Sequence, residues 1–599
     1  LGTHNCGGWS SSGGPWTLPE NSMQVVVTRE VRIKGPVRFS AVLPVPESYL
    51  PPAYTNSYRD IAVLAYPTPP NEIITMGAAS PKATISEGKK AKSPTFVGDL
   101  LTSFALPASS GDSPSYVQIA FPEPFTARQL ILAPERKGPG FSGTLETSND
   151  GATFTSVRTF QIAGQPERQE YPYRQIMVFP QVSARVFRIR VEKEQAANKP
   201  ILIAEAGLSG RQTVDDLPGK AFYQRHSIQS KPEKKPGATA KDDGTVAISD
   251  VIDLSGKMDH TGRLTWDAPS GNWTVVRVGH QSNGMLNHPA PLGGEGLESD
   301  KLSKEATDAH WAGMMGKLIE KFGPLAGKSF TKVEIDSWEV GSQNWTPKFR
   351  EEFARRRGYE MTRFFPVFAG QTIDSAEATE RFLWDFRRTV ADLFAENYAG
   401  HMRELANKHR MELAVENYGT GPFDDLQYGG MIDIPMGVHW MHNGSPMGCT
   451  MLAASAAHTY GRKIVGSEAF TAGESGGNRW DTDPYALKRL GDLMYCSGVN
   501  RFIFHAATLQ RWPNLVPGLT FGKVGTQFSR TVTWGENGGT AWFRYLSRCQ
   551  WMLQHGLPAA DVCVLASEGA PPPTYGGSSF PDVPQGYDFD MCSTDAFLN

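Results

Sequence analysis

The sequence lacks the features that identify membrane and nucleic-acid-binding proteins. Its 599 residues contain no apolar run of about 18 residues or more, so no transmembrane helix is predicted. The formal net charge is −3 and the pI about 6.5, a balance that favours neither a nucleic-acid nor a membrane-surface partner. An initiator methionine is also missing, so the absence of a leader is uninformative.

Cysteine is scarce and scattered. The six cysteines stand at positions 6, 449, 496, 549, 563 and 592. None forms a CxxC pair, and no Cys/His group has the spacing of a zinc site. We therefore expect most of the cysteines to be buried free thiols. The sequence leaves the formation of one disulfide as an alternative.

Aromatic residues, in contrast, are plentiful, with 14 Trp, 18 Tyr and 31 Phe. Trp-rich loops suit flat, half-polar ligands such as sugars, although core packing explains most single tryptophans equally well. At about 150 residues per domain, the length predicts about four domains. We divide the chain into a barrel segment (1–23), a β-rich insertion (24–75), a β-sandwich (76–212), a β-rich insertion with a linker (213–270), a catalytic barrel (271–556) and the start of an α/β domain (557–599).

The first half of the chain has a strand pattern. Short alternating runs such as SYVQIAF (115–121), ARQLILAP (127–134) and ARVFRIRV (184–191) are separated by turn residues, including Asn149-Asp150-Gly151. This spacing predicts a sandwich. The polar stretch 231–244 is interpreted as a linker or exposed loop.

After about residue 290, apolar strands alternate with helical patterns, which indicates parallel βα units. Polar residues are predicted at the carboxyl ends of five successive strands: Asp336, Glu339, Glu416, Asn417, Asp433, His439, Glu468 and His505. In a (β/α)8 barrel these ends meet on the face that holds the active site. The alternative is that these residues are helix N-caps or satisfied buried polar groups.

Counting strands extends the barrel toward the start of the chain. Residues 272–284 can form a further strand that ends near His280, and LGTHNCGGW (1–9) another, with His4 and Asn5 at its carboxyl end and Trp9 in the following loop. The first strand of the barrel would then precede Leu1, and the block 24–270 would be an insertion. We expect a fragment truncated at both ends, because a new strand at 558–567 begins a domain that the chain does not complete.

Several stretches together resemble one enzyme family. They are HNCGGWSSSGGPW (4–16), GLESDKLS (296–303), EIDSWEVGSQNWTPKF (334–349), AVENYG (414–419), DIPMG (433–437), ASAAHTYGRKIVGSEAFT (454–471) and WFRYLSRCQWMLQHG (542–556). They are similar to the α-L-rhamnosidases of glycoside hydrolase family 106. The inserted block resembles a discoidin-like sandwich. The resemblance implies a (β/α)8 catalytic domain with β insertions, further domains absent here, and a periplasmic or secreted location.

The chemistry of glycoside cleavage needs two carboxyls, one protonated and one ionised. The best candidates are Glu339 and Glu468, each at a strand end and each within a matching stretch. We assign Glu339 as general acid and Glu468 as general base, with the reverse left open, and the resemblance implies an inverting mechanism. Asp336 is expected to tune the pKa of Glu339, to hold the sugar or to bind a metal.

The remaining polar residues are predicted to contact substrate hydroxyls or to support those that do: His4, Asn5, Trp9, His280, Asp336, Trp338, Glu416, Asn417, Asp433, His439 and His505. The resemblance also implies association with calcium, and since no EF-hand-like loop is present, such a site would be assembled from separate strand ends. One departure is notable. The family carries an acidic residue before the Trp in the stretch after DIPMG, where this chain has Val438-His439.

The sequence therefore predicts an inverting α-L-rhamnosidase acting on rhamnose-containing plant or microbial oligo- or polysaccharides. Two alternatives stay open: a carbohydrate-binding or adhesion protein with an inactive barrel, and a glycosidase of another specificity on the same barrel.

Overall fold

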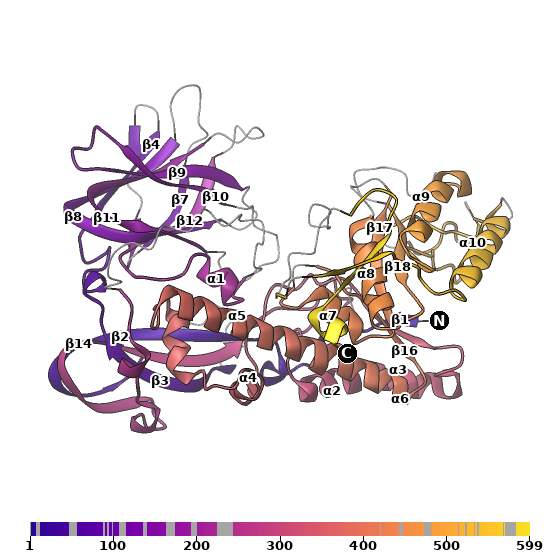
Figure 1. Cartoon of the computed structure of the whole chain (residues 1–599), viewed down its shortest axis with the longest axis horizontal. Helices are drawn as coiled ribbons and strands as arrows, with labels where there is room; N and C mark the ends of the chain where they lie inside the picture. Colours follow the sequence, from indigo (N-terminus) through magenta and orange to yellow (C-terminus); the bar gives the residue numbers. More distant parts are fainter. Residues whose placement is uncertain are drawn as a thin grey trace. The chain divides into compact units, whose positions relative to one another are not determined.

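The computed structural model describes most of the chain (Figure 1). The described residues are 2–6, 12–46, 57–87, 90–92, 95–98, 100–106, 115–135, 140–162, 174–192, 200–224, 244–419, 421–441, 447–472, 480, 482–512, 514–520, 524–531, 534–535, 538–566, 568–569 and 583–598. They divide into unit 1 (Leu1–Ser22, Leu286–Val340 and Val390–Asn599) and unit 2 (Met23–Met285 and Gly341–Thr389). No helix within these ranges is long and apolar enough to cross a membrane.

Unit 1 is built on a parallel sheet (Figure 1). Its strands, in spatial order, are β1 (Gly2–His4), β15 (Lys332–Ile335), β16 (Glu412–Glu416), β17 (Ile434–Trp440), β18 (Gly466–Thr471) and β19 (Arg501–Phe504). Its helices are α2 (Lys304–Gly313), α3 (Met315–Phe322), α6 (His401–Lys408), α7 (Asp425–Gly430), α8 (Met447–Thr459), α9 (Pro484–Cys496), α10 (Gly539–Leu553) and α11 (Thr594–Leu598). All six strands fall in segments predicted as parallel strands.

The prediction that residues 272–284 form a barrel strand is wrong. They belong to β14 (Arg263–Ser282), which pairs antiparallel with β2 (Gln24–Val42) and β3 (Arg59–Pro67) in unit 2. Val275, Val276 and Val278 are all fully buried, so this strand has the continuous apolar pattern that also marks a parallel strand. β1 instead pairs directly with β15, and the described sheet is an open one with β1 and β19 at its edges.

Unit 2 contains two antiparallel sheets. The smaller has the order β13 (Ile252–Asp253), β3, β14 and β2. The larger contains β4 (Lys82–Glu87), β5 (Lys90–Lys92), β6 (Thr95–Val97), β7 (Leu100–Leu106), β8 (Ser115–Pro134), β9 (Phe141–Ser148), β10 (Thr155–Ile162), β11 (Gln175–Val191) and β12 (Ile201–Ser209). The helices of unit 2 are α1 (Leu217–Lys220), α4 (Phe349–Arg357) and α5 (Ala376–Leu393). Of α5, the part up to Thr389 belongs to this unit.

The strands predicted for the first half are confirmed, with 115–121 and 127–134 joined in one long strand, β8. The predicted turn lies between β9 and β10, where the Asp150 carboxylate accepts the backbone N–H groups of Ala152 and Thr153, both at 2.8 Å. The predicted linker lies outside the described residues up to residue 243. Residues 341–389, which we assigned to the catalytic segment, belong to unit 2.

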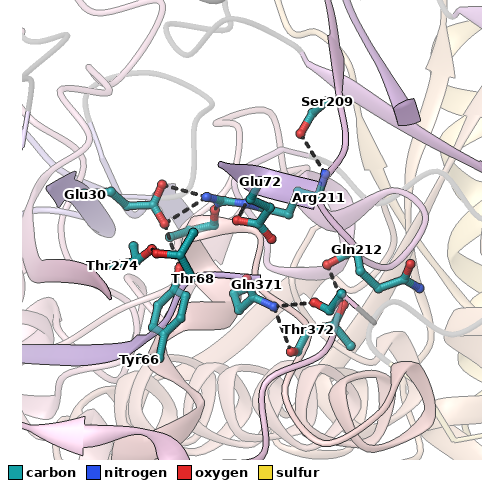
Figure 2. A network of polar contacts seen from close by, with 12 residues as sticks. Glu30, Tyr66, Thr68, Glu72, Ser209, Arg211, Gln212, Thr274, Gln371 and Thr372 are labelled. Carbon is teal, nitrogen blue, oxygen red and sulfur yellow. Dashed lines mark hydrogen bonds and ion pairs between the residues drawn. The ribbon is translucent and has the colours of Figure 1, made fainter. Parts of the chain in front are cut away.

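A buried ion network stabilises unit 2 (Figure 2). The Arg211 guanidinium donates to Glu30 at 2.8 Å and to Glu72 at 3.1 Å, and it also reaches the carbonyl of Ala369. Burial alone would raise the pKa of Glu30, but the charge and hydrogen bond of Arg211, the charge of Arg32 and the hydrogen bond of Tyr66 together outweigh it and hold that pKa below its ordinary value. The planar fork of arginine, with donors in several directions, suits this role.

We expect Arg211→Lys to lower the free energy of unfolding of unit 2 by about 1–2 kcal/mol, because lysine cannot hold both carboxylates in a fixed fork. Chemical denaturation monitored by tryptophan fluorescence measures it. Arg381→Lys is the matched control, because Arg381 pairs with Glu377 on the exposed surface of α5. An equal loss of stability in both variants would contradict the prediction.

Candidate active site

Three carboxylates converge at the carboxyl edge of the parallel sheet. Asp336 follows β15, Glu416 ends β16 and Glu468 lies in β18, and one oxygen of each lies within 4.8 Å of the others. Ile335 pairs in register with Val415, so Asp336 and Glu416 follow side by side on the same face. On the same face of the sheet, Ala414, Ile434 and Met436 form a small apolar cluster, in which Met436 is in register with Glu416. The sheet thus brings together residues that are more than 130 positions apart in the sequence.

Glu468 is held as an ionised carboxylate. Its Oε1 accepts the Thr471 hydroxyl at 2.6 Å and lies 2.9 Å from the Nδ1 of His505. Burial raises the pKa of Glu468, but the hydrogen bond and charge of His505, the hydrogen bond of Thr471 and the charge of His4 together outweigh that effect and lower it. Burial conversely lowers the pKa of His505, and Glu468 reverses this and raises it. The two side chains therefore stabilise each other as an ion pair.

Asp336 and Glu416 carry the opposite tendency. Burial, followed by the charge of Glu468, raises the pKa of Asp336, although His4 lies 3.5 Å from it. Burial and the charge of Asp336 raise the pKa of Glu416 well above its ordinary range, and the Tyr418 hydroxyl donates to its Oε2 at 2.7 Å. Desolvation in a confined site, reinforced by neighbouring negative charge, is the common cause.

Glu334 is a site residue that the sequence analysis missed. It is in register with His4 and Ala414, two residues before Asp336 and on the same face of β15. Burial raises its pKa to about 7, and the charges of Asp336 and Glu468 act in the same direction. The two-residue alternation of Glu334 and Asp336 was the signal that could have identified it.

Glu339 has a different environment from Glu468. It lies in the loop after β15, and its side chain is 40% exposed. The Ser337 hydroxyl donates to its Oε1 at 3.0 Å, and His288 Nε2 lies 4.0 Å from its Oε2. Of the two predicted catalytic carboxyls, Glu339 thus follows a strand of the parallel sheet and is accessible, whereas Glu468 lies within a strand of that sheet and is fixed by two hydrogen bonds.

Two other predicted contact residues are buried by packing. Trp338 lies against Phe394 and Phe423, with ring centroids 5.1 and 5.9 Å apart. The Asn417 amide donates to the backbone carbonyl of Asp425 at 3.0 Å. Both residues therefore support the loops around the carboxylates.

His439 occupies the position where the resemblance leads one to expect an acidic residue. Its Nδ1 lies 2.8 Å from the Ser467 hydroxyl, and its ring packs against Phe470 and Phe502. Burial lowers its pKa to about 3. Val438 is in register with Glu468, so Val438 shares the face of the carboxylates and His439 faces the opposite side of the sheet.

The prediction that Asp433 stands at a carboxyl end is wrong. It immediately precedes β17, at the amino end, where its carboxylate pairs with Arg403 at 2.6 Å and accepts the backbone N–H of Leu413 at 3.0 Å. A polar residue at the start of a short strand is easily assigned to the wrong edge. His280 is not brought to the carboxylates by the parallel sheet: it lies in β14 of unit 2, 3.1 Å from Gln24.

The first residues of the chain are held in place by hydrogen bonds to the buried His310. The neutral His310 ring accepts the backbone N–H of Gly13 and the indole N–H of Trp16 at Nδ1, so its Nε2 donates to Asn5. Burial lowers the pKa of His310 to about 3, which keeps this pattern of bonds. Gly13 has a φ of +109°, and a Cβ there would lie 2.4 Å from the Leu297 carbonyl oxygen. The Nδ1 of His4 lies 3.5 Å from the Asp336 carboxylate, and Trp9 lies outside the described residues.

The alternative that the strand-end carboxylates are helix caps finds no support in these helices. The N-caps of α2, α7 and α9 are Ser303, Asp424 and Asp483, none of which was predicted as a site residue. Asp336, Glu416 and Glu468 therefore do not cap these three helices.

Known proteins resemble this chain over nearly its whole length. The chain is similar to a rhamnosidase from Novosphingobium sp. PP1Y, with a TM-score of 0.83 and 28% identity over 99% of this chain and 56% of that one. It is 32% identical over 98% of its length to a protein of Formosa agariphila named "Putative beta-glucuronidase", of which it spans 37%. A profile of glycoside hydrolase family 106, described as alpha-L-rhamnosidase, matches residues 1–599, and the chain therefore belongs to this glycoside hydrolase family.

Proposed function

We propose that this chain carries the acid–base centre of an inverting α-L-rhamnosidase that acts on rhamnose-containing plant or microbial glycans. The observation that carries the proposal is the pair of unlike carboxyls: Glu339, accessible after β15, and Glu468, fixed in β18 by Thr471 and His505. An inverting enzyme needs one carboxylic acid to protonate the leaving oxygen and one carboxylate to activate water on the opposite face of the sugar, with the two about 6.5–9.5 Å apart.

The roles follow from the two environments. Glu468 is held ionised by His505, so it is suited to accept a proton from the attacking water. Glu339 lies in the loop after β15 with its side chain 40% exposed, so a glycosidic oxygen can reach it, and it is suited to deliver a proton there. We further propose that the six parallel strands are part of a (β/α)8 barrel, in which β15 and β18 would face each other across the mouth.

The experiment that tests this function is a time-resolved NMR measurement of an α-L-rhamnoside during cleavage. Initial release of rhamnose with inverted anomeric configuration is expected. Release with retained configuration would refute the inverting mechanism, and no release would refute the activity.

We also propose that Asp336, Glu416 and Glu468 bind calcium. Oxygens that share one calcium ion at about 2.4 Å lie at most about 4.8 Å apart, which the three carboxylates satisfy. The buried Oε1 of Glu416 has no hydrogen-bond partner among the described residues, as expected for a ligand atom. Calcium bound there would offer coordination positions to sugar hydroxyls and would offset the negative charge of the site.

Glu416→Gln is expected to weaken calcium binding at least about tenfold, because an amide replaces one of the charged ligands. Isothermal titration with Ca²⁺ after chelation measures it, and chelation alone is expected to lower activity. Glu412→Gln at the amino end of β16 is the matched control, since Glu412 pairs with Lys332. Unchanged calcium affinity in Glu416→Gln would refute this ligand set.

A second candidate is a glycosidase of another sugar specificity. It is favoured by the name of the Formosa relative and by Val438, which places an apolar side chain beside Glu468 on the substrate face. Assays with a panel of aryl glycosides separate the two: cleavage of a glucuronide in preference to a rhamnoside would establish the second candidate.

The large antiparallel sheet of unit 2 is proposed to be a discoidin-like carbohydrate-binding domain, and the protein to be periplasmic or secreted, where such glycans occur. The long antiparallel strands β8, β11 and β12 support this assignment. Retardation of the inactive Glu468→Gln variant in a gel containing a rhamnose-rich polysaccharide tests the binding role.

A further inference from the structure

Two cysteines near the end of the chain lie against each other in a small parallel sheet. The sheet consists of β20 (Val562–Leu565) and β21 (Phe589–Cys592). Cys563 is in register with Asp590, and since side chains alternate along a strand, Cys592 lies on the same face as Asp590 and Cys563. The Sγ atoms of Cys563 and Cys592 are 3.2 Å apart.

The pair is asymmetric in its access to solvent. Cys563 is exposed, whereas Cys592 is 3% exposed. Burial, together with the neighbouring Cys563 thiol, raises the pKa of Cys592 to about 11. Cys563 is therefore the thiol that an external reagent meets first, and Cys592 is positioned to attack it afterwards.

We propose that Cys563 and Cys592 are a disulfide-forming pair that reacts with a small-molecule or protein disulfide by thiol–disulfide exchange. The Cys563 thiolate attacks one sulfur of the donor, which forms a mixed disulfide and expels one donor thiolate. Cys592 Sγ then attacks Cys563 Sγ, which forms the internal bond and expels the second donor thiolate. The two protein thiols lose two protons and two electrons, and the donor disulfide takes up both to become two thiols.

The surrounding contacts show what this bond would connect. β21 is attached to α8 by Asp590, whose carboxylate lies 3.0 Å from His458, and by the Met591 N–H, which donates to Ser455 at 3.0 Å. The side chains of β20 are alternately half-buried and exposed. A disulfide with an S–S distance of about 2.05 Å would therefore join β20, whose Cys563 and Leu565 side chains are exposed, to β21, which is anchored on α8.

The test uses the 599-residue chain equilibrated in a glutathione redox buffer, followed by thiol counting and peptide mapping without reduction. The oxidised protein is expected to lose two of its six thiols and to give a peptide that joins Cys563 to Cys592. Proteolysis within residues 560–566 is expected to slow at least about tenfold on oxidation, since the cross-link restricts local opening.

Two variants separate the steps. Cys592→Ser is expected to stop at the mixed disulfide, with one glutathione on Cys563, and Cys563→Ser is expected to leave Cys592 reduced. Cys496→Ser, on α9, is the matched control and should still form the bond. Six remaining thiols in the oxidised wild-type chain, or a cross-link to any other cysteine, would overturn the proposal. Neither outcome depends on glycosidase activity.

Discussion

Glu339→Gln is expected to lower turnover of a rhamnoside with a poor leaving group by at least ~100-fold, the usual scale for loss of a general acid. Glutamine has nearly the same shape, and its amide can still accept the Ser337 hydroxyl that now bonds Glu339 Oε1 at 3.0 Å. The variant therefore removes the transferable proton with little change in packing. Steady-state kinetics on alkyl and aryl α-L-rhamnosides measures the effect.

The choice of substrate identifies the role of Glu339. A leaving group of low pKa departs without protonation, so an activated aryl rhamnoside should recover most of the lost turnover in Glu339→Gln. Glu412→Gln is the control, because it changes the same residue type at the opposite edge of the sheet. Equal losses on good and poor leaving groups would show that Glu339 is not the acid, and near-wild-type turnover on both would remove it from catalysis.

The second large effect is expected for Glu468→Gln, which should lower turnover at least ~100-fold on every leaving group. An amide cannot accept the proton of the attacking water, and activated leaving groups do not change that step. The variant also removes the charge that pairs with His505 at 2.9 Å, so the pKa of His505 should fall. NMR titration of the His505 ring measures this independently of the assay.

These two readouts distinguish catalysis from structure. If Glu468→Gln lost activity only on poor leaving groups, the acid and base assignments would have to be exchanged. If turnover fell while the His505 titration was unchanged, the loss could not be assigned to the ion pair seen in the structure. Thermal unfolding of both variants provides the check that the parallel sheet remains folded.

Much of the parallel sheet could be predicted from the sequence because its signal is local. β16, β17 and β19 are short runs of mostly apolar residues followed by polar ones, whereas β15 and β18 combine apolar residues with Glu334 and Glu468. The prediction failed at residues 272–284, where the same apolar run serves an antiparallel strand. Local pattern reports burial on both faces, and it does not report the direction or identity of the partner strand.

The candidate site, like the parallel sheet, could be predicted from the sequence only in part. Asp336, Glu416, Glu468 and His505 stand where the strand pattern placed them, whereas Asp433 lies at the amino end of β17 and His439 faces Phe470 and Phe502. A shift of one residue along a strand reverses the side of the sheet, so strand bounds that are uncertain by a residue leave the orientation of such side chains open.

The sequence by itself determined the residue types of the site and the alternation of strands and helices that carries them, because these depend on local hydrophobic pattern. Only the tertiary structure decided which carboxylates share one site and which charge each holds. Glu468 is ionised because His505, 37 positions away, bonds it, and the pKa of Glu334 rises to about 7 because it is buried and lies near the charges of Asp336 and Glu468. Such shifts arise from distances and desolvation across strands, which no local stretch of sequence contains.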